Sequence, residues 1–313
     1  MRKLSIVLVL ILLASAITVW VAEASDQELL ETYEFLGKIY EKQGKYQKAI
    51  EVWQKGVRLF LDNVDFHNNL AELYWQERMY EQALIEYQRI VELQPEDYNS
   101  WLGIAKSQRK LKRYDRSLAI CERLIRDSDW IAPAAQLEKG FVYFDQEEYK
   151  RARREYQKVI DDYPNSHMAD DTQYEIGLSF SKEKQYERAN EEYQKVIDTY
   201  SSSEFAPRAQ YAIAHNLYKQ KRYKEAIGEF REVVENYPQN ERAPEAQYAV
   251  GRSFFLQGKF GQAIKEYKKV LKLSDKKEHR ERVYKALTDI YRRTGNIDKL
   301  EKLEEERELN KGI

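Results

Sequence analysis

Residues 33–53 of this 313-residue chain read YEFLGKIYEKQGKYQKAIEVW. The same arrangement of small and aromatic residues returns along the chain. Its alanine, Ala49, is followed at the matching place by Ala83, Ser117, Ala152, Ala189, Ala226 and Ala263. The intervals are 34, 34, 35, 37, 37 and 37 residues, and a near-constant period in this range is typical of stacked helical hairpins. The sequence therefore predicts one repeat array rather than a globular domain.

When the repeats are aligned, two positions hold small residues and three hold large ones; each such position is called a column. With the small residue of the first expected helix set to position 8, the repeats begin near Leu30, Val64, Tyr98, Pro133, Asp170, Pro207, Pro244 and Glu281. Positions 8 and 20 hold Gly, Ala or Ser in nearly every repeat, which allows two antiparallel helices to approach closely. Positions 11, 17 and 24 hold mostly Tyr, Phe or Trp, and we expect these rings to fill the space between helices.

These columns resemble the tetratricopeptide repeat, whose pattern is aromatic-Leu-Gly-Tyr-Gly-Tyr-Ala-aromatic-Pro over 34 residues. The first repeat carries it as Tyr33, Leu36, Gly37, Tyr40, Gly44, Tyr46, Ala49 and Trp53. The resemblance covers about residues 27–309. It implies an all-α, right-handed superhelical solenoid of about eight antiparallel helical hairpins.

The array has two styles of repeat. Repeats 1–3, at residues 25–132, have the 34-residue period, and repeats 4–7, at residues 133–280, have the 37-residue period. We expect residues 281–313 to form an incomplete C-terminal capping repeat and an acidic tail.

The longer repeats carry a distinctive junction, seen at residues 237–240 (YPQN) and 247–251 (QYAVG). It resembles the repeats of bacterial envelope proteins, among them the lipoprotein of the outer-membrane β-barrel assembly machinery and the Tol-associated cell-division coordinator. Ser166, Ser203 and Asn240 stand where a helix needs an N-cap, so the three extra residues are predicted to form a capped turn.

The first 24 residues differ from the rest. Arg2 and Lys3 precede an apolar run that ends at Ala22, and Ala24 completes a small-x-small site. This pattern predicts a signal peptide cleaved after Ala24. The run is also nearly long enough to cross a bilayer, so an uncleaved membrane anchor stays open. Both interpretations predict an exported protein, in the periplasm or anchored and facing it.

Catalytic motifs are missing from the sequence. The four histidines are dispersed without metal-ligand spacing, and no phosphate-binding loop or hydrolase motif occurs. The single cysteine, Cys121, falls in the position 24 packing column. With only one cysteine, the chain cannot form an internal disulfide. The 52 basic and 53 acidic residues nearly cancel, which does not favour nucleic acid as a partner. No enzyme activity, cofactor or metal is expected.

In tetratricopeptide repeats, positions 2, 5, 9, 12 and 13 of the first helix line the groove that holds a partner. In repeats 4–7 these positions form an aromatic stripe of Leu137, Phe141, Phe144, Tyr174, Tyr211, His215, Tyr218, Tyr248, Arg252 and Phe255. The stripe either captures a protein or peptide, or its rings are packing residues covered by the next repeat. Repeat 3 adds Lys106, Arg109 and Lys110, which either orient a partner or form a solvated helix face.

Together these features predict a non-enzymatic scaffold or adaptor that binds protein or peptide partners in a bacterial cell-envelope assembly. Two alternatives remain open. One is a structural protein that oligomerises with itself, and the other is an accessory subunit that supports an envelope polysaccharide or peptidoglycan synthesis enzyme.

Overall fold

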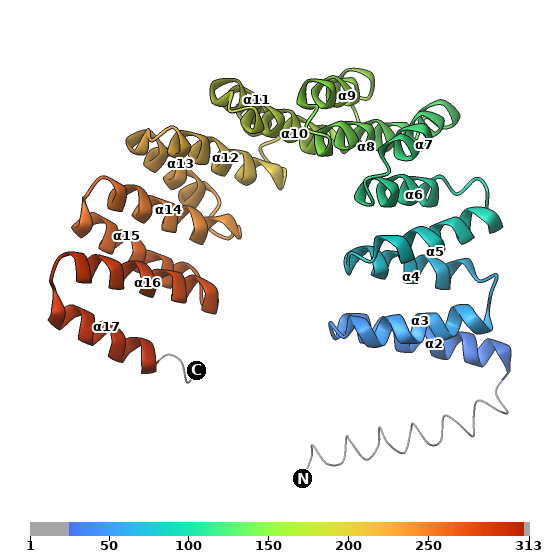
Figure 1. Cartoon of the computed structure of the whole chain (residues 1–313), viewed down its shortest axis with the longest axis horizontal. Helices are drawn as coiled ribbons and strands as arrows, with labels where there is room; N and C mark the ends of the chain where they lie inside the picture. The colour runs from blue at the N-terminus through green and yellow to red at the C-terminus, as the bar shows by residue number, and fades with distance from the viewer. Residues whose placement is uncertain (1–24, 310–313) are drawn as a thin grey trace, which may run out of the picture. The chain divides into compact units, whose positions relative to one another are not determined.

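The computed structural model describes residues 25–309, and sixteen α-helices with no strand make up this part of the chain (Figure 1). The expected signal peptide or membrane anchor, residues 1–24, lies outside the described residues. No helix within residues 25–309 is both long enough and apolar enough to cross a membrane. The chain divides into two compact units, here called the N-terminal half, which ends at Val142, and the C-terminal half, which begins at Tyr143.

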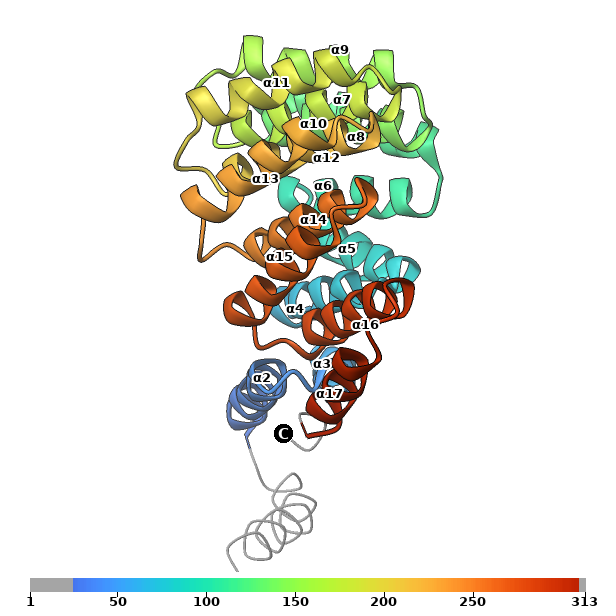
Figure 2. The same cartoon turned by 90° about the vertical axis from the view of Figure 1, so that its left-hand side faces the viewer.

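The helices alternate between the first and the second helix of a repeat. Those of the N-terminal half are α2 (Asp26–Lys42), α3 (Tyr46–Leu59), α4 (Val64–Gln76), α5 (Tyr80–Leu93), α6 (Tyr98–Lys110) and α7 (Tyr114–Asp127). Helix α8 (Ala132–Asp145) contains the division between the halves. Those of the C-terminal half are α9 (Tyr149–Asp162), α10 (Ala169–Lys182), α11 (Tyr186–Thr199), α12 (Phe205–Lys219), α13 (Tyr223–Asn236), α14 (Arg242–Leu256), α15 (Phe260–Leu273), α16 (Lys277–Arg293) and α17 (Ile297–Leu309). Within the C-terminal half, α12 packs against both α10 and α14, so first helices neighbour one another (Figure 2).

The two columns of small residues lie where the helices approach most closely. The position 20 residues, from Ala49 to Ala263, are all fully buried. At position 8, an added Cβ on Gly37 would lie 2.3 Å from the ring of Trp53, and one on Gly177 would lie 2.7 Å from the ring of Tyr193. At Gly37 and Gly177 the ring at position 24 of the second helix therefore leaves no room for a Cβ on the first helix.

Ser166, Ser203 and Asn240 lie in the turns before α10, α12 and α14 and close them with side-chain hydrogen bonds, but they are not the N-caps as predicted; those are Met168, Glu204 and Glu241, without side-chain cap bonds. The side-chain oxygens of Ser166, Ser203 and Asn240 accept from the backbone N–H two residues later, at 3.2, 3.0 and 2.9 Å. These bonds satisfy N–H groups that a helix start leaves without a partner. The prolines of three junctions, such as Pro244 in α14, fall in the first turn of a helix, where the missing N–H costs little.

A glutamine four positions into each longer repeat has a structural role that the sequence alone did not reveal. The side-chain amides of Gln173, Gln210 and Gln247 donate to Glu192, Glu229 and Glu266 of the following helix, at 2.6, 2.6 and 2.8 Å. The three glutamines are buried, so each bond satisfies a polar group that would otherwise be costly to bury.

The last repeat is more complete than expected. Its second helix, α17, runs to Leu309 and packs against α16. Leu303 is buried in the contact, and Leu300, which replaces the small residue of position 20, packs against the same core. Residues 281–309 therefore form a full hairpin that covers the apolar end of the array.

A buried ionic contact joins α4 to α5 in the N-terminal half. His67 is only 4% exposed, and its Nδ1 and Nε2 lie 2.6 Å from a carboxylate oxygen of Glu86 and 2.9 Å from the carbonyl oxygen of Leu61. Both neighbours are acceptors, so the protonated ring satisfies both. Burial lowers the pKa of His67, but the hydrogen bonds to Glu86 and to the Leu61 carbonyl, together with the charge of Glu86, outweigh it and hold that pKa above the ordinary value.

Matched glycine substitutions test the close approach of the helices. Nothing lies within 4 Å of a Cβ added to Gly228 in α13, whereas one on Gly177 meets the Tyr193 ring at 2.7 Å. Gly177→Ala should lower the free energy of unfolding by about 1–3 kcal/mol through overpacking. Gly228→Ala should raise it by roughly 0.5–1 kcal/mol, because alanine favours the helix. Thermal unfolding followed by circular dichroism measures the stability of both variants. Equal changes in the free energy of unfolding would show that Gly177 does not lie tightly against the Tyr193 ring.

The His67–Glu86 contact predicts a pH dependence of stability. Because the folded pKa is raised, the contribution is fully present below the unfolded value of 6.5 and is lost as the pH rises through the folded pKa. Between about pH 6 and pH 9, the wild type should lose about 1–2 kcal/mol more free energy of unfolding than His67→Gln, because a charge-assisted hydrogen bond disappears. Urea unfolding at the two pH values checks this. If the free energy of unfolding falls equally between the two pH values in the wild type and in His67→Gln, the contact with Glu86 does not cause the pH dependence.

Candidate functional site

The C-terminal half carries a cavity of about 250 Å³ on the face made by its first helices. The side chains that line it come from α10, α11, α12 and the start of α14. They include the sequence-predicted stripe residues Tyr174, Tyr211 and His215, together with Lys182, Arg208, Lys219 and Arg242. The structure thus brings three residues of the predicted stripe to one place and adds four basic residues that sequence reasoning missed.

A ladder of three rings runs along α12, and the first two, Tyr211 and His215, line the cavity. The rings of Tyr211 and His215 are stacked at 6.2 Å, and those of His215 and Tyr218 at 6.5 Å, with interplanar angles of 14° and 10°. Residues four and three apart on a helix share one face, which aligns the rings. Burial, and then the charge of Lys219, lower the pKa of His215. The ladder is therefore uncharged at neutral pH and offers a flat apolar wall.

The rim of the cavity is basic. The guanidinium of Arg242 lies 5.6 Å from the centre of the Tyr211 ring and also pairs with Glu245 at 3.0 Å. Lys182 and Lys219 are exposed and have no carboxylate partner among the described residues. None of the described residues that line the cavity is acidic. The site is therefore suited to a ligand that offers both a carboxylate and an apolar or aromatic group.

An acidic residue, Asp171, stands in the first turn of α10, close enough to Arg208 to feel its charge. Burial, and then the neighbouring Asp170, raise the pKa of Asp171 to about 6. This carboxylate therefore loses its negative charge in mildly acidic solution, which makes the surroundings of Arg208 more positive.

The other stripe residues of the C-terminal half pack on one side and face solvent on the other. Phe144 makes an edge contact with Tyr149 at 5.2 Å, and Phe255 lies 5.6 Å from Phe260. Guanidinium groups cover two of these rings. Arg282 lies 4.4 Å from the Tyr248 ring, while Arg252 and Arg293 lie 5.3 and 5.1 Å from the Phe255 ring. These rings are half-buried, so they combine packing with exposure, and their role in binding stays a prediction.

Two expectations for the N-terminal half need correction. Leu137 was expected in the stripe, but it is only 6% exposed and belongs to the core, because the helix turns this position inward. Arg109 was expected on a charged helix face, but it is buried and its guanidinium pairs with Glu138 at 2.6 Å. The guanidinium also lies 5.3 Å from the ring of Phe141, which is half-buried. Burial raises the pKa of Glu138 despite this partner.

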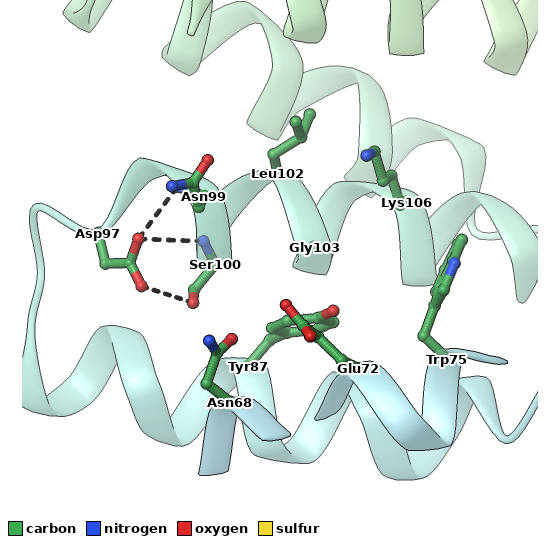
Figure 3. Close-up of a pocket in the computed structure, with 10 residues that line it drawn as sticks. All are labelled: Asn68, Glu72, Trp75, Tyr87, Asp97, Asn99, Ser100, Leu102, Gly103 and Lys106. Atoms are coloured by element: carbon green, nitrogen blue, oxygen red, sulfur yellow. Dashed lines mark hydrogen bonds between the residues drawn. The ribbon is translucent and has the colours of Figure 1, made fainter. Parts of the chain in front are cut away.

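A second cavity, of about 360 Å³, lies in the N-terminal half between α4, α5 and α6 (Figure 3). Of the residues that line it, sequence reasoning singled out only Lys106. The signal was available, since Asn68, Glu72 and Trp75 occupy positions 5, 9 and 12 of repeat 2, the same positions that form the stripe in the later repeats.

The structure gives no sign of redox or metal chemistry in the part of the chain that it describes. Cys121 is fully buried, and burial raises the pKa of its thiol, which confirms its expected place as a small packing residue. No cluster of His, Cys, Asp and Glu within the described residues is arranged to hold a metal ion.

Comparisons with known families and structures agree with this architecture. A family model described as TPR repeat matches residues 37–77, and two described as tetratricopeptide repeat match residues 64–97 and 134–166. A model described as outer membrane lipoprotein matches residues 168–292. No curated protein matches the chain.

Among solved structures, a tetratricopeptide repeat protein from Parabacteroides merdae has a TM-score of 0.54 at 14% identity, over 84% of this chain and 99% of that one. PilF of Pseudomonas aeruginosa has a TM-score of 0.47 at 17% identity, over 71% of this chain and 97% of that one. The first likeness shows the same repeat fold.

Proteins built from this repeat are generally non-catalytic scaffolds that bind other proteins. The tetratricopeptide matches together cover residues 37–97 and 134–166, and repeats 5–7 fall within the lipoprotein match. The chain is therefore a tetratricopeptide repeat protein, an all-α repeat solenoid whose C-terminal repeats, at residues 168–292, match the model described as outer membrane lipoprotein.

Proposed function

We propose that this protein is a non-enzymatic scaffold of a bacterial cell-envelope assembly, and that the first-helix face of its C-terminal half binds an extended segment of a partner protein. The observation that carries the proposal is the cavity between α10, α12 and α14, which combines the stacked rings of Tyr211 and His215 with four basic residues and no acidic lining residue.

The chemistry of this cavity specifies the partner segment. Stacked rings offer a large contact area with few rotatable bonds, so they bind an aromatic or apolar side chain at low entropic cost. Lys182, Lys219 and Arg208 attract carboxylates, and such attraction also speeds encounter. A partner segment in which acidic residues flank an aromatic residue satisfies both requirements.

The location in the envelope rests on two further observations. The apolar run at residues 4–22, with its basic flank, is the pattern of an exported protein. The match of residues 168–292 to the outer membrane lipoprotein family favours the same compartment. In this proposal the repeats face the periplasm, and membrane contact is limited to the N-terminal segment.

Site-specific photocrosslinking tests the proposed surface. A photoreactive amino acid placed at Lys182 or Lys219, which line the cavity, should form covalent adducts with the same envelope protein in living cells. The matched positions Lys184 and Lys221 lie two residues further along the chain, in the loops after the same helices, and do not line the cavity. They should give no such adduct.

Affinity measurements with the crosslinked partner complete the test. The double variant Lys182→Gln/Lys219→Gln should weaken binding by about tenfold or more, whereas Lys184→Gln/Lys221→Gln should leave it unchanged, because loss of a charge-assisted contact costs about 1.5–3 kcal/mol. Adducts confined to the loop positions would refute the site. Adducts only with a second copy of the chain would favour the self-oligomerising alternative instead.

A further inference from the structure

We propose that two copies of this chain associate through the first helix of the array, with α2 of one copy packed antiparallel against α2 of the other. The contact surface is the end face of α2, defined here as Thr32, Phe35, Leu36 and Ile39. It belongs to the N-terminal half alone and does not depend on the surface proposed for the C-terminal half.

The end face occupies positions that a later repeat buries against the hairpin before it. Positions 3, 7 and 10 of repeat 2 hold Phe66, Leu70 and Leu73, and none of them is more than 2% exposed. The Phe66 ring lies 5.7 Å from the ring of Trp53 in α3, the second helix of the preceding repeat. This side of a first helix is therefore shaped to receive another helix.

In repeat 1 this side remains uncovered. Among the described residues no helix precedes α2, and Phe35 is 65% exposed while Thr32, Leu36 and Ile39 are half-buried. The hydroxyl of Thr32 donates to the carbonyl oxygen of Glu28 at 2.7 Å, so it is satisfied within α2 and costs little to bury. The last helix, α17, instead exposes charged residues such as Glu301, Lys302 and Glu305. An end that exposes a ring rather than charges favours burial against a partner.

The charges beside Phe35 are complementary to those of a second copy turned by 180°. Glu28 and Glu31 precede Phe35 by seven and four residues, and Lys38 and Lys42 follow it by three and seven. All four charged residues are exposed. Residues three, four and seven apart share one side of a helix. The carboxylates therefore line the first half of this side, and the ammonium groups line the second half.

Antiparallel packing about a two-fold axis at Phe35 pairs opposite charges. Each residue before Phe35 then lies opposite the residue equally far beyond it in the second copy, so Glu28 meets Lys42. Glu31 likewise comes beside Lys38. Parallel packing would place each charge against the same charge of the second copy, which is unfavourable. The order of charges along α2 therefore selects the antiparallel dimer.

The contacts that these charges make within α2 are weak. Glu31 accepts from the side-chain amide of Gln27 at 2.7 Å, and Lys38 lies 3.7 Å from Glu34. Both contacts are exposed to solvent, where such pairs contribute little, so they can be exchanged for contacts with a second copy. Glu28 also completes the capping box of α2, and the variants below therefore leave it unchanged.

The size of the surface suits a reversible dimer. The 17 residues of α2 span about 26 Å, and a contact along one helix is at the small end of specific protein interfaces. We therefore expect the dimer to form and dissociate with concentration. The opposite side of α2 is held in place, since a Cβ added to Gly37 would lie 2.3 Å from the Trp53 ring, so little order is lost when the copies associate.

Matched charge reversals test the proposal. Sedimentation equilibrium of the full chain in density-matched mild detergent should show a monomer–dimer equilibrium over a range of concentrations. Glu31→Lys alone and Lys38→Glu alone should each weaken the dimer by about tenfold or more, because each places like charges together at both symmetric contacts. An equimolar mixture of the two variants should restore the dimer, because both contacts then join opposite charges.

Cysteine crosslinking locates the contact. The native Cys121 is fully buried, and burial raises the pKa of its thiol, so it does not contribute. Phe35→Cys should give a disulfide-linked dimer on oxidation by air, because the two-fold axis brings the two thiols together. Ile85→Cys, on α5, replaces a similarly exposed apolar residue, 61% against 65%, and should give none.

Further variants keep the result decisive. Glu51→Lys and Lys55→Glu, at exposed positions of α3, make the same charge changes away from the end face and should dimerise like the wild type. Restoration by mixing excludes misfolding as the cause of the weaker association. A monomer at every concentration, or a dimer equally stable in every variant, would overturn the proposal. Neither result would affect the site of the C-terminal half.

Discussion

The structure depends on the contact between a ring at position 24 and a small residue at position 8. Trp53 against Gly37 and Tyr193 against Gly177 show how little space is left, since one added carbon would overlap the ring. The contact fixes both the distance and the rotation of the two helices in a hairpin. Because this kind of contact recurs from repeat to repeat, each hairpin presents the next with a surface of similar shape.

The same contact also determines which positions of the repeat can differ from one repeat to the next. The inward positions are occupied by packing, whereas positions 5, 9 and 12 of the first helix lie at the edge of the hairpin contact, where rings such as Tyr211 and Tyr218 touch the second helix and are half-buried. In repeat 6 these positions hold Tyr211, His215 and Tyr218, and in repeat 2 they hold Asn68, Glu72 and Trp75. One backbone thus carries two unlike surfaces, one aromatic with a basic rim and one polar with both charges.

Arginines that do not belong to the repeat columns place positive charge over the rings of the first helices. Arg242 and Arg282 lie over the rings of Tyr211 and Tyr248, and neither belongs to the aromatic columns. Of the two, Arg242 lines the cavity, and it stands at the start of α14 directly after the turn that Asn240 closes by accepting from its backbone N–H. This turn therefore contributes to the surface as well as to the fold.

The sequence by itself determined the helical hairpins, the period, the packing columns and the turns of the longer repeats, because each is a local pattern repeated many times. Glycine and alanine opposite large rings, and proline or serine at helix starts, have the same physical consequence wherever they occur. Only the tertiary structure decided which outward residues meet. Arg109 is turned into an ion pair with Glu138, Leu137 is buried, and Asn68 comes to face a cavity shared with Asn99. These outcomes depend on the packing of neighbouring hairpins, which no single repeat contains.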